Sequence, residues 1–261
     1  MSKTNKRYKT KMLETDRFRM KCQKKFKFLK DDKYEKNNFD TLCNIIDELI
    51  DAINNKMDIE TINRVKSHPD RLIYHANNIL KISHNIEFKQ NKQKLNELKV
   101  AILYHDISKC INFEKYNGER KKDHALFSGI ILETVMKYLE FEQEVIDRIT
   151  KNIIYHTDKR PGNPNNLDYA GMLLIDVDIM DEQDVYGVLM AMAIKGNNDK
   201  VIRNNLINQK NIERCLVEFI HDINALDKLI LEDSLKYYHT VMEKIESILT
   251  LIKMENEEVY I

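Results

Sequence analysis

The sequence predicts an all-α protein, a helical bundle, and three observations support this prediction. Glycine and proline are scarce, with 6 and 3 among 261 residues, so few positions would interrupt a helix. Apolar residues recur at spacings of three and four along most of the chain, which is the period of a buried helix face. There is no Gly-rich phosphate loop and no convincing strand pattern.

The apolar periodicity predicts the helices in order. They are expected over 39–57, from Asp58 or Pro69 to Ile82, over 91–105, 124–139, 142–156, 167–181 and 186–194, and as two or three further helices within 199–254. Asp123 is the expected N-cap of the helix that follows it. The clearest break is Arg160 to Pro164, which holds two prolines and a glycine.

Charge and composition suggest how the chain is divided. The net charge is zero, yet residues 1–36 carry 14 Lys and Arg against 5 Asp and Glu, so the remainder carries −9. We therefore expect a basic N-terminal arm (1–36), a helical domain (37–200, with its motifs in 70–185) and C-terminal helices (201–261) that pack on or extend this domain. The arm could meet an anionic partner such as nucleic acid or lipid, although a solvated, partly disordered N-terminus is the simpler interpretation.

The cysteines and apolar runs bear on the compartment. The four cysteines form no CxxC pair, so reduced thiols are expected rather than a disulfide framework. No apolar run approaches the length of a membrane span, and no hydrophobic signal region begins the chain. A cytoplasmic protein is the expectation, and the oligomeric state is left open.

Histidines and acids that could bind a metal occur on successive predicted helices. His105 and Asp106 follow an apolar run, and burying such a pair is costly unless something binds it. The other candidates, each near the inner face or end of a predicted helix, are His75, His124, His156 and Asp178. Core packing would explain any one of them equally well, but five helices with one each favour a metal site inside a bundle. Imidazole and carboxylate together suit Mn, Fe, Co, Ni or Zn.

These residues resemble the motifs of the HD superfamily of metal-dependent phosphohydrolases. The matching segments are His75 with the apolar helix to Ile82, Leu103-Tyr-His-Asp-Ile-Ser-Lys109, His124-Ala-Leu-Phe-Ser-Gly129, Ile153-Ile-Tyr-His156 and Ile175-Asp-Val-Asp-Ile-Met-Asp181. Within the superfamily, His156-Thr-Asp-Lys-Arg-Pro-Gly162 is similar to a segment of the HD-type symmetric dinucleoside-tetraphosphate hydrolases. Lys159 stands there in place of their glycine.

The resemblance implies an HD-domain bundle with one or two divalent transition-metal ions. His75, His105, Asp106 and Asp178 would ligate the first ion, and His124 and His156 would complete a second site bridged by Asp106. A metal-activated hydroxide would then hydrolyse a phosphoester or phosphoanhydride of a nucleotide or related compound. Asp106, Lys109 and Arg160 are the expected catalytic residues, the last two as phosphate contacts.

Two other interpretations stay open. The chain could be an HD-fold regulatory or interaction protein that binds metal or nucleotide without significant turnover, or a helical scaffold whose histidines are core residues. A second His-Asp pair, at His221 and Asp222, has no matching histidine-bearing helices after it and is interpreted as structural. The same interpretation is given to His68, His84 and His239, although His68 precedes the first ligand helix and could line a pocket.

Overall fold

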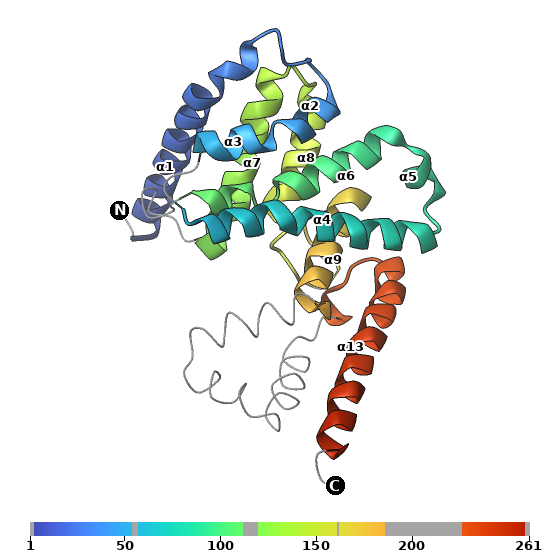
Figure 1. Ribbon diagram of the computed structural model, residues 1–261. Helices are drawn as coiled ribbons and strands as arrows, with labels where there is room; N and C mark the ends of the chain where they lie inside the picture. The colour runs from blue at the N-terminus through green and yellow to red at the C-terminus, as the bar shows by residue number, and fades with distance from the viewer. Residues whose placement is uncertain (1–2, 54–56, 112–119, 161, 186–225, 259–261) are drawn as a thin grey trace.

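The computed structural model describes residues 3–53, 57–111, 120–160, 162–185 and 226–258 (Figure 1). In these ranges the regular elements are helices and there is no strand, so the predicted all-α class is confirmed. The α-helices are α1 (Lys3–Lys25), α2 (Phe39–Asn44), α3 (Ile46–Ile53), α4 (Ile59–Ile82), α5 (Ile86–Gln90), α6 (Lys92–Tyr104), α7 (Arg120–Tyr138), α8 (Gln143–Tyr155), α9 (Tyr169–Gln183) and α13 (Glu232–Glu258). None of them is long and apolar enough to cross a membrane.

Several of these helices have an Asn or Asp residue as their N-cap. The side chains of Asn38, Asp58, Asn91 and Asp168 accept a backbone N–H from the first turns of α2, α4, α6 and α9, which satisfies donors that have no partner within the helix. The predicted cap at Asp123 is wrong, because α7 begins three residues earlier and Asp123 lies inside its first turn.

Two predicted helices have different boundaries in the structure. The predicted helix over 39–57 is divided into α2 and α3 at Ile45, whose φ of −90° and ψ of 2° are not helical. The sequence predicts that the next helix starts at Asp58 or at Pro69. The structure agrees with the first, because α4 starts at Ile59 and continues through Pro69. His68 and His75 therefore belong to one continuous helix.

The central helices enclose a single apolar core. α7 packs against α8, α4 packs against α9, and α6 contacts both α8 and α9 (Figure 1). Most of α9 is buried, including Asp176, Asp178 and Asp181. Gly171 brings α9 close to α8, since a Cβ at this position would lie 2.3 Å from Asn152 Oδ1. The carboxylates of Asp176, Asp178 and Asp181 therefore lie inside the bundle.

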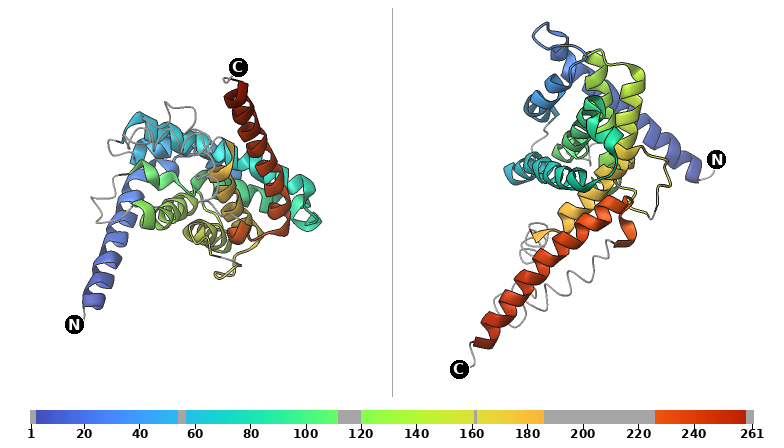
Figure 2. Two further views of the ribbon diagram at one scale, coloured as in Figure 1. Left: turned by 90° about the horizontal axis from the view of Figure 1, so that it is seen from below. Right: turned by 90° about the vertical axis from the view of Figure 1, so that its right-hand side faces the viewer.

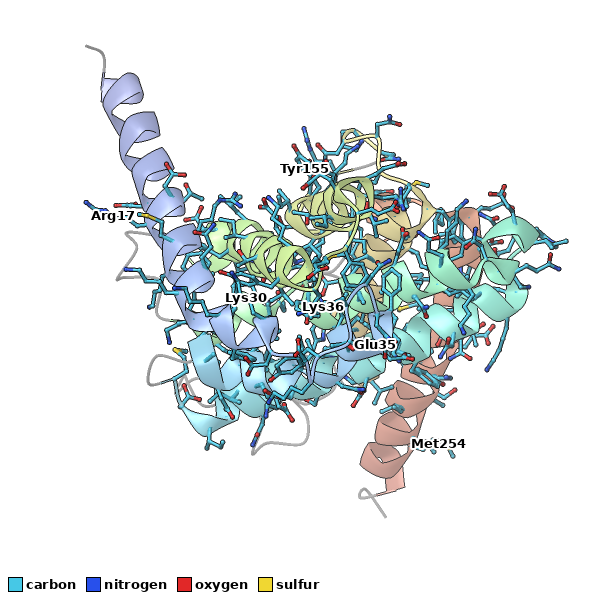
Figure 3. The ribbon with its side chains drawn as sticks, turned by 90° about the horizontal axis from the view of Figure 1, so that it is seen from above. Arg17, Lys30, Glu35, Lys36, Tyr155 and Met254 are labelled. Carbon is cyan, nitrogen blue, oxygen red and sulfur yellow. The ribbon has the colours of Figure 1, made fainter. Side chains whose placement is uncertain are left out.

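The N-terminal segment contributes to this core. Phe18 is buried and meets Phe127 of α7 edge-on at 4.6 Å between ring centroids. Leu29 is also buried, and its carbonyl accepts a hydrogen bond of 2.7 Å from Lys36 Nζ. Residues 14–36 therefore differ from the expected solvated, partly disordered arm: most of their apolar side chains pack into the core, while most of their charged residues are exposed. The start of α1 does extend away from the other helices (Figure 2), and Arg17 is exposed (Figure 3).

The C-terminal helix α13 is attached through its first half. It packs against α4 and α9, and its far end projects from the bundle (Figure 2). Asp176 of α9 accepts the backbone N–H groups of Ile230, at 2.8 Å, and Leu231, at 2.9 Å, just before α13 begins. Burial raises the pKa of Asp176 to about 6, although these donors favour the ionised form. The helix predicted over 186–194, and the pair His221 and Asp222, lie outside the described residues.

Candidate metal centre

Six polar side chains from five parts of the fold meet inside the bundle. We call them the His-Asp cluster: His68 of α4, His105 and Asp106 after α6, His124 of α7, His156 after α8 and Asp178 of α9. Five of these six are residues that the sequence analysis selected.

Asp106 lies at the middle of the His-Asp cluster. Its Oδ1 is 3.3 Å from His124 Nε2 and 3.8 Å from His156 Nε2. Its Oδ2 is 3.6 Å from His105 Nε2 and 4.0 Å from His68 Nε2. One carboxylate thus approaches four imidazole nitrogens.

Asp178 forms a second carboxylate centre beside it. Its Oδ1 lies 3.2 Å from His68 Nε2 and 3.9 Å from His105 Nε2. Two sets of three potential ligand atoms, each within 4.8 Å of one another, come from His68, His105 and Asp178 and from His105, Asp106 and His156. These groups could hold a metal ion.

The orientation of two imidazoles follows from the ends of their helices. His105 and His156 are the C-caps of α6 and α8, and each Nδ1 lies 2.7 Å from the carbonyl oxygen three residues earlier. A carbonyl can only accept, so Nδ1 carries the hydrogen and a neutral ring has its lone pair on Nε2. Burial lowers the pKa of His105, and lowers that of His156 to about 4. The neutral His156 ring therefore presents an Nε2 lone pair to the cluster at neutral pH.

Two buried atoms in the cluster are left without hydrogen bonds. Among the described residues, neither His105 Nε2 nor Asp106 Oδ1 has a hydrogen-bond partner. His124 Nε2 and His156 Nε2 also face each other at 3.2 Å. A buried polar atom without a partner costs about 1–3 kcal/mol, and a bound cation would remove this cost. The donor set therefore fits a divalent transition metal.

Each carboxylate of the cluster is accompanied by a lysine. Lys109 Nζ donates to Asp106 Oδ2, and Lys159 Nζ lies 2.9 Å from Asp178 Oδ2. Burial favours the neutral acids, but His105 and Lys109 hold the pKa of Asp106 below its usual range. Lys159 and His68 do the same for Asp178. Both carboxylates are therefore ionised at neutral pH.

The structure does not bring the predicted ligand His75 to the cluster. His75 follows His68 by seven residues in the same helix, a rise of roughly 10 Å. Its Nε2 lies 3.2 Å from Asp184 Oδ2, and its Nδ1 lies 3.3 Å from the Tyr237 hydroxyl. His75, Asp181 and Asp184 form a separate group of potential ligands. His68, interpreted from the sequence as structural, occupies the place expected for His75.

The predicted phosphate contact Arg160 also lies outside the cluster. Its side chain is 67% exposed and pairs with Asp158, with 2.5 Å between Nε and Oδ1. The adjacent Lys159 is turned inward instead, and its Nζ also lies 2.8 Å from Glu182 Oε1. Of these two adjacent cations, Lys159 rather than Arg160 therefore lies beside the His-Asp cluster.

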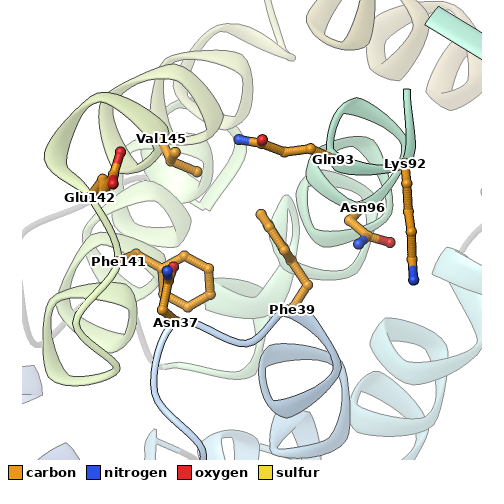
Figure 4. A pocket seen from close by; sticks show the side chains of 8 residues that line it. All are labelled: Asn37, Phe39, Lys92, Gln93, Asn96, Phe141, Glu142 and Val145. Atoms are coloured by element: carbon orange, nitrogen blue, oxygen red, sulfur yellow. The ribbon is translucent and has the colours of Figure 1, made fainter. Parts of the chain in front are cut away.

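The structure also has a cavity of about 440 Å³ beside α6 and the start of α8 (Figure 4). No member of the His-Asp cluster lines it; its walls are formed by Asn37, Phe39, Lys92, Gln93, Asn96, Phe141, Glu142 and Val145. Asn96 precedes His105 by nine residues, roughly 13 Å of helix, so this cavity is distinct from the cluster.

Fold and site together define an all-α protein with a buried histidine-aspartate cluster able to hold a metal ion. In comparisons with family models, curated proteins and solved structures, the chain has no match.

Proposed function

We propose that this chain is a metal-dependent phosphohydrolase of the HD superfamily, acting on a phosphoester or phosphoanhydride of a nucleotide or related compound. The observation that carries the proposal is the surroundings of Asp106. Its buried, ionised carboxylate faces the Nε2 atoms of His105, His124 and His156, and its Oδ1 has no hydrogen-bond partner among the described residues.

These distances support a proposal of two ligand sets. His68, His105, Asp106 and Asp178 would hold one ion, and Asp106, His124 and His156 a second. This is the set expected from the HD resemblance, with His68 in place of His75. Divalent ions bound there would polarise a phosphoryl oxygen and lower the pKa of a bound water.

The chain itself contributes orientation and fixed charge. The Nδ1 hydrogen bonds of His105 and His156 to the backbone hold their rings so that Nε2 points inward. Lys109 and Lys159, each beside a cluster carboxylate, are the cations best placed to bind phosphoryl oxygens at its edge. Arg160 takes no part in this scheme, because it is exposed and pairs with Asp158.

The test combines metal analysis with a substrate panel. The purified chain is loaded with Mn, Fe, Co, Ni or Zn in turn, its metal content is measured, and phosphate release is followed with nucleoside mono- and triphosphates, cyclic nucleotides and dinucleoside polyphosphates. Asp106→Asn removes the central charge. Asp176→Asn is the matched control, because Asp176 is an equally buried carboxylate that caps the backbone before α13.

We expect stoichiometric metal and metal-dependent phosphate release in the wild type and in Asp176→Asn, and loss of both in Asp106→Asn. Metal-loaded protein that hydrolyses no member of the panel would instead favour the regulatory alternative. Activity that survives Asp106→Asn would contradict the assignment of the site.

A further inference from the structure

A second layer of polar residues lies directly behind the His-Asp cluster. His68 and Arg71 are three residues apart on α4, and Asp178 and Asp181 are three residues apart on α9. Residues at this spacing share a helix face. Since α4 packs against α9, the two pairs face each other across one helix contact.

Asp181 contacts the side of the His68 ring that faces away from the cluster. His68 Nδ1 lies 2.8 Å from Asp181 Oδ2, and a carboxylate can only accept, so His68 donates this hydrogen bond. The opposite nitrogen, Nε2, is then the atom directed at Asp178, at 3.2 Å. Asp181 and Asp178 thus contact opposite nitrogens of the His68 ring, with Nε2 on the side of the cluster.

Arg71 holds Asp181 in place. Its Nε donates to Asp181 Oδ1 at 2.6 Å and its Nη2 to Asp181 Oδ2 at 2.9 Å, a two-pronged contact. This planar pairing fixes the carboxylate in direction as well as position. With both Asp181 oxygens engaged and only 5% of the residue exposed, the carboxylate has little freedom to rotate.

We propose that Asp181 and Arg71 are positioning residues that hold the His68 imidazole with Nε2 directed into the metal centre. Their role at the metal rests on the proposed function, whereas the immobilisation of the His68 ring does not. Ligand histidines in metal sites commonly donate their second N–H to a carboxylate, and removing such a partner typically costs about 10–100-fold in metal affinity.

The chain contains a matched control for a purely structural role. Glu97 of α6 and Arg148 of α8 form another two-pronged pair around a buried carboxylate, with Nε to Oε2 and Nη2 to Oε1 both at 2.7 Å. Glu97 is 2% exposed, so this carboxylate is at least as buried as Asp181. Neither Glu97 nor Arg148 contacts a member of the His-Asp cluster in the hydrogen bonds and ion pairs of the described residues.

The experiment uses two readouts on the full chain. The first is Mn²⁺ affinity by calorimetry, and the second is the order parameter of the His68 ring from ¹³C relaxation in metal-free, histidine-labelled protein. The variants are Asp181→Asn and Arg71→Gln, compared with Glu97→Gln and Arg148→Gln. Circular dichroism confirms that each is folded, and Arg71→Gln serves if Asp181→Asn does not fold.

We expect Asp181→Asn and Arg71→Gln to weaken Mn²⁺ binding about 10–100-fold and to loosen the His68 ring, with neither effect in the control pair. An unchanged His68 ring in both site variants, or equal losses of affinity in the control pair, would overturn the proposal. A wild type that binds none of Mn, Fe, Co, Ni and Zn, but whose His68 ring loosens in Asp181→Asn, would overturn the proposed function while leaving the role of Asp181 in holding His68 intact.

Discussion

His68 and His75 allow the ligand assignment to be tested by two similar substitutions. Both histidines lie on α4, two turns apart, with their side chains 14% and 2% exposed. Each contacts a carboxylate of α9 or the residue just after it, at 3.2 Å in both cases. Only His68 is a member of the His-Asp cluster. His68→Ala should therefore weaken metal binding, and His75→Ala should leave it unchanged.

The expected size of the effect follows from the number of ligands. Structural zinc sites bind with roughly 10–16 kcal/mol, so one ligand of four is worth about 3 kcal/mol, or about 100-fold in affinity. Metal at about 1,000 times its Kd stabilises a protein by about 4 kcal/mol, and a 100-fold weaker site leaves about 1.4 kcal/mol. For a chain of this size, these values correspond to increases in Tm of about 8–16 °C and 3–6 °C.

The assay is thermal unfolding by circular dichroism with excess chelator and then with a fixed concentration of Mn²⁺. The quantity compared is the increase in Tm that metal produces in each variant, because both substitutions also lower the metal-free Tm by removing buried atoms. The wild type and His75→Ala should show the full increase, and His68→Ala the smaller one. A full increase in His68→Ala together with a lost increase in His75→Ala would refute the assignment.

Three further predictions concern the phosphate contact, the pH dependence and the helix packing. Lys159→Ala should lower kcat/KM about 10–100-fold, as expected for losing a charged hydrogen bond to phosphate, whereas Arg160→Ala should leave kcat/KM unchanged. Steady-state phosphate release measures both values. A loss in Arg160→Ala with none in Lys159→Ala would contradict the choice of Lys159 as the phosphate contact. Burial alone would lower the pKa of His68, but its hydrogen bonds to Asp178 and Asp181 outweigh this and raise it to about 9. The stabilisation of the metal-free protein by His68 should therefore be complete below pH ~6.5 and be lost as the pH rises through ~9, a change of about 3 kcal/mol in the free energy of unfolding. Urea unfolding across this pH range measures the change. The same pH dependence in His68→Gln would contradict the prediction. Gly171→Ala should destabilise the fold by about 1–3 kcal/mol, because its Cβ would lie 2.3 Å from Asn152 Oδ1; an unchanged urea midpoint would show that Asn152 moves aside freely.

The sequence predicts the central helices well because each carries its own local signals. Asn91 caps α6, and the apolar stripe of α8 ends at His156, so both helices and the residues they present could be identified. The clustering of His105, Asp106, His124, His156 and Asp178 could likewise be anticipated, since each lies at the end or on the inner face of a predicted helix.

The structure departs from the predicted arrangement where neighbouring positions are equivalent locally and only tertiary structure separates them. His68 and His75 lie on the same face of one helix, and the position of Asp178 on α9 determines which of them enters the cluster. The sequence also allows a helix start at Pro69, whereas α4 continues through this residue. Lys159 and Arg160 are adjacent in a loop, and the direction of that loop turns the first inward and the second outward.

The most direct measurement is anomalous X-ray diffraction from crystals grown with Mn²⁺. The central claim is that the His-Asp cluster is a metal centre, and the anomalous signal locates the ion without reference to any substrate. We expect a peak enclosed by His68, His105, Asp106 and Asp178, with a second ion, where bound, between Asp106, His124 and His156. An anomalous map with no peak at these positions, or with its peak beside His75 and Asp184, would contradict the claim.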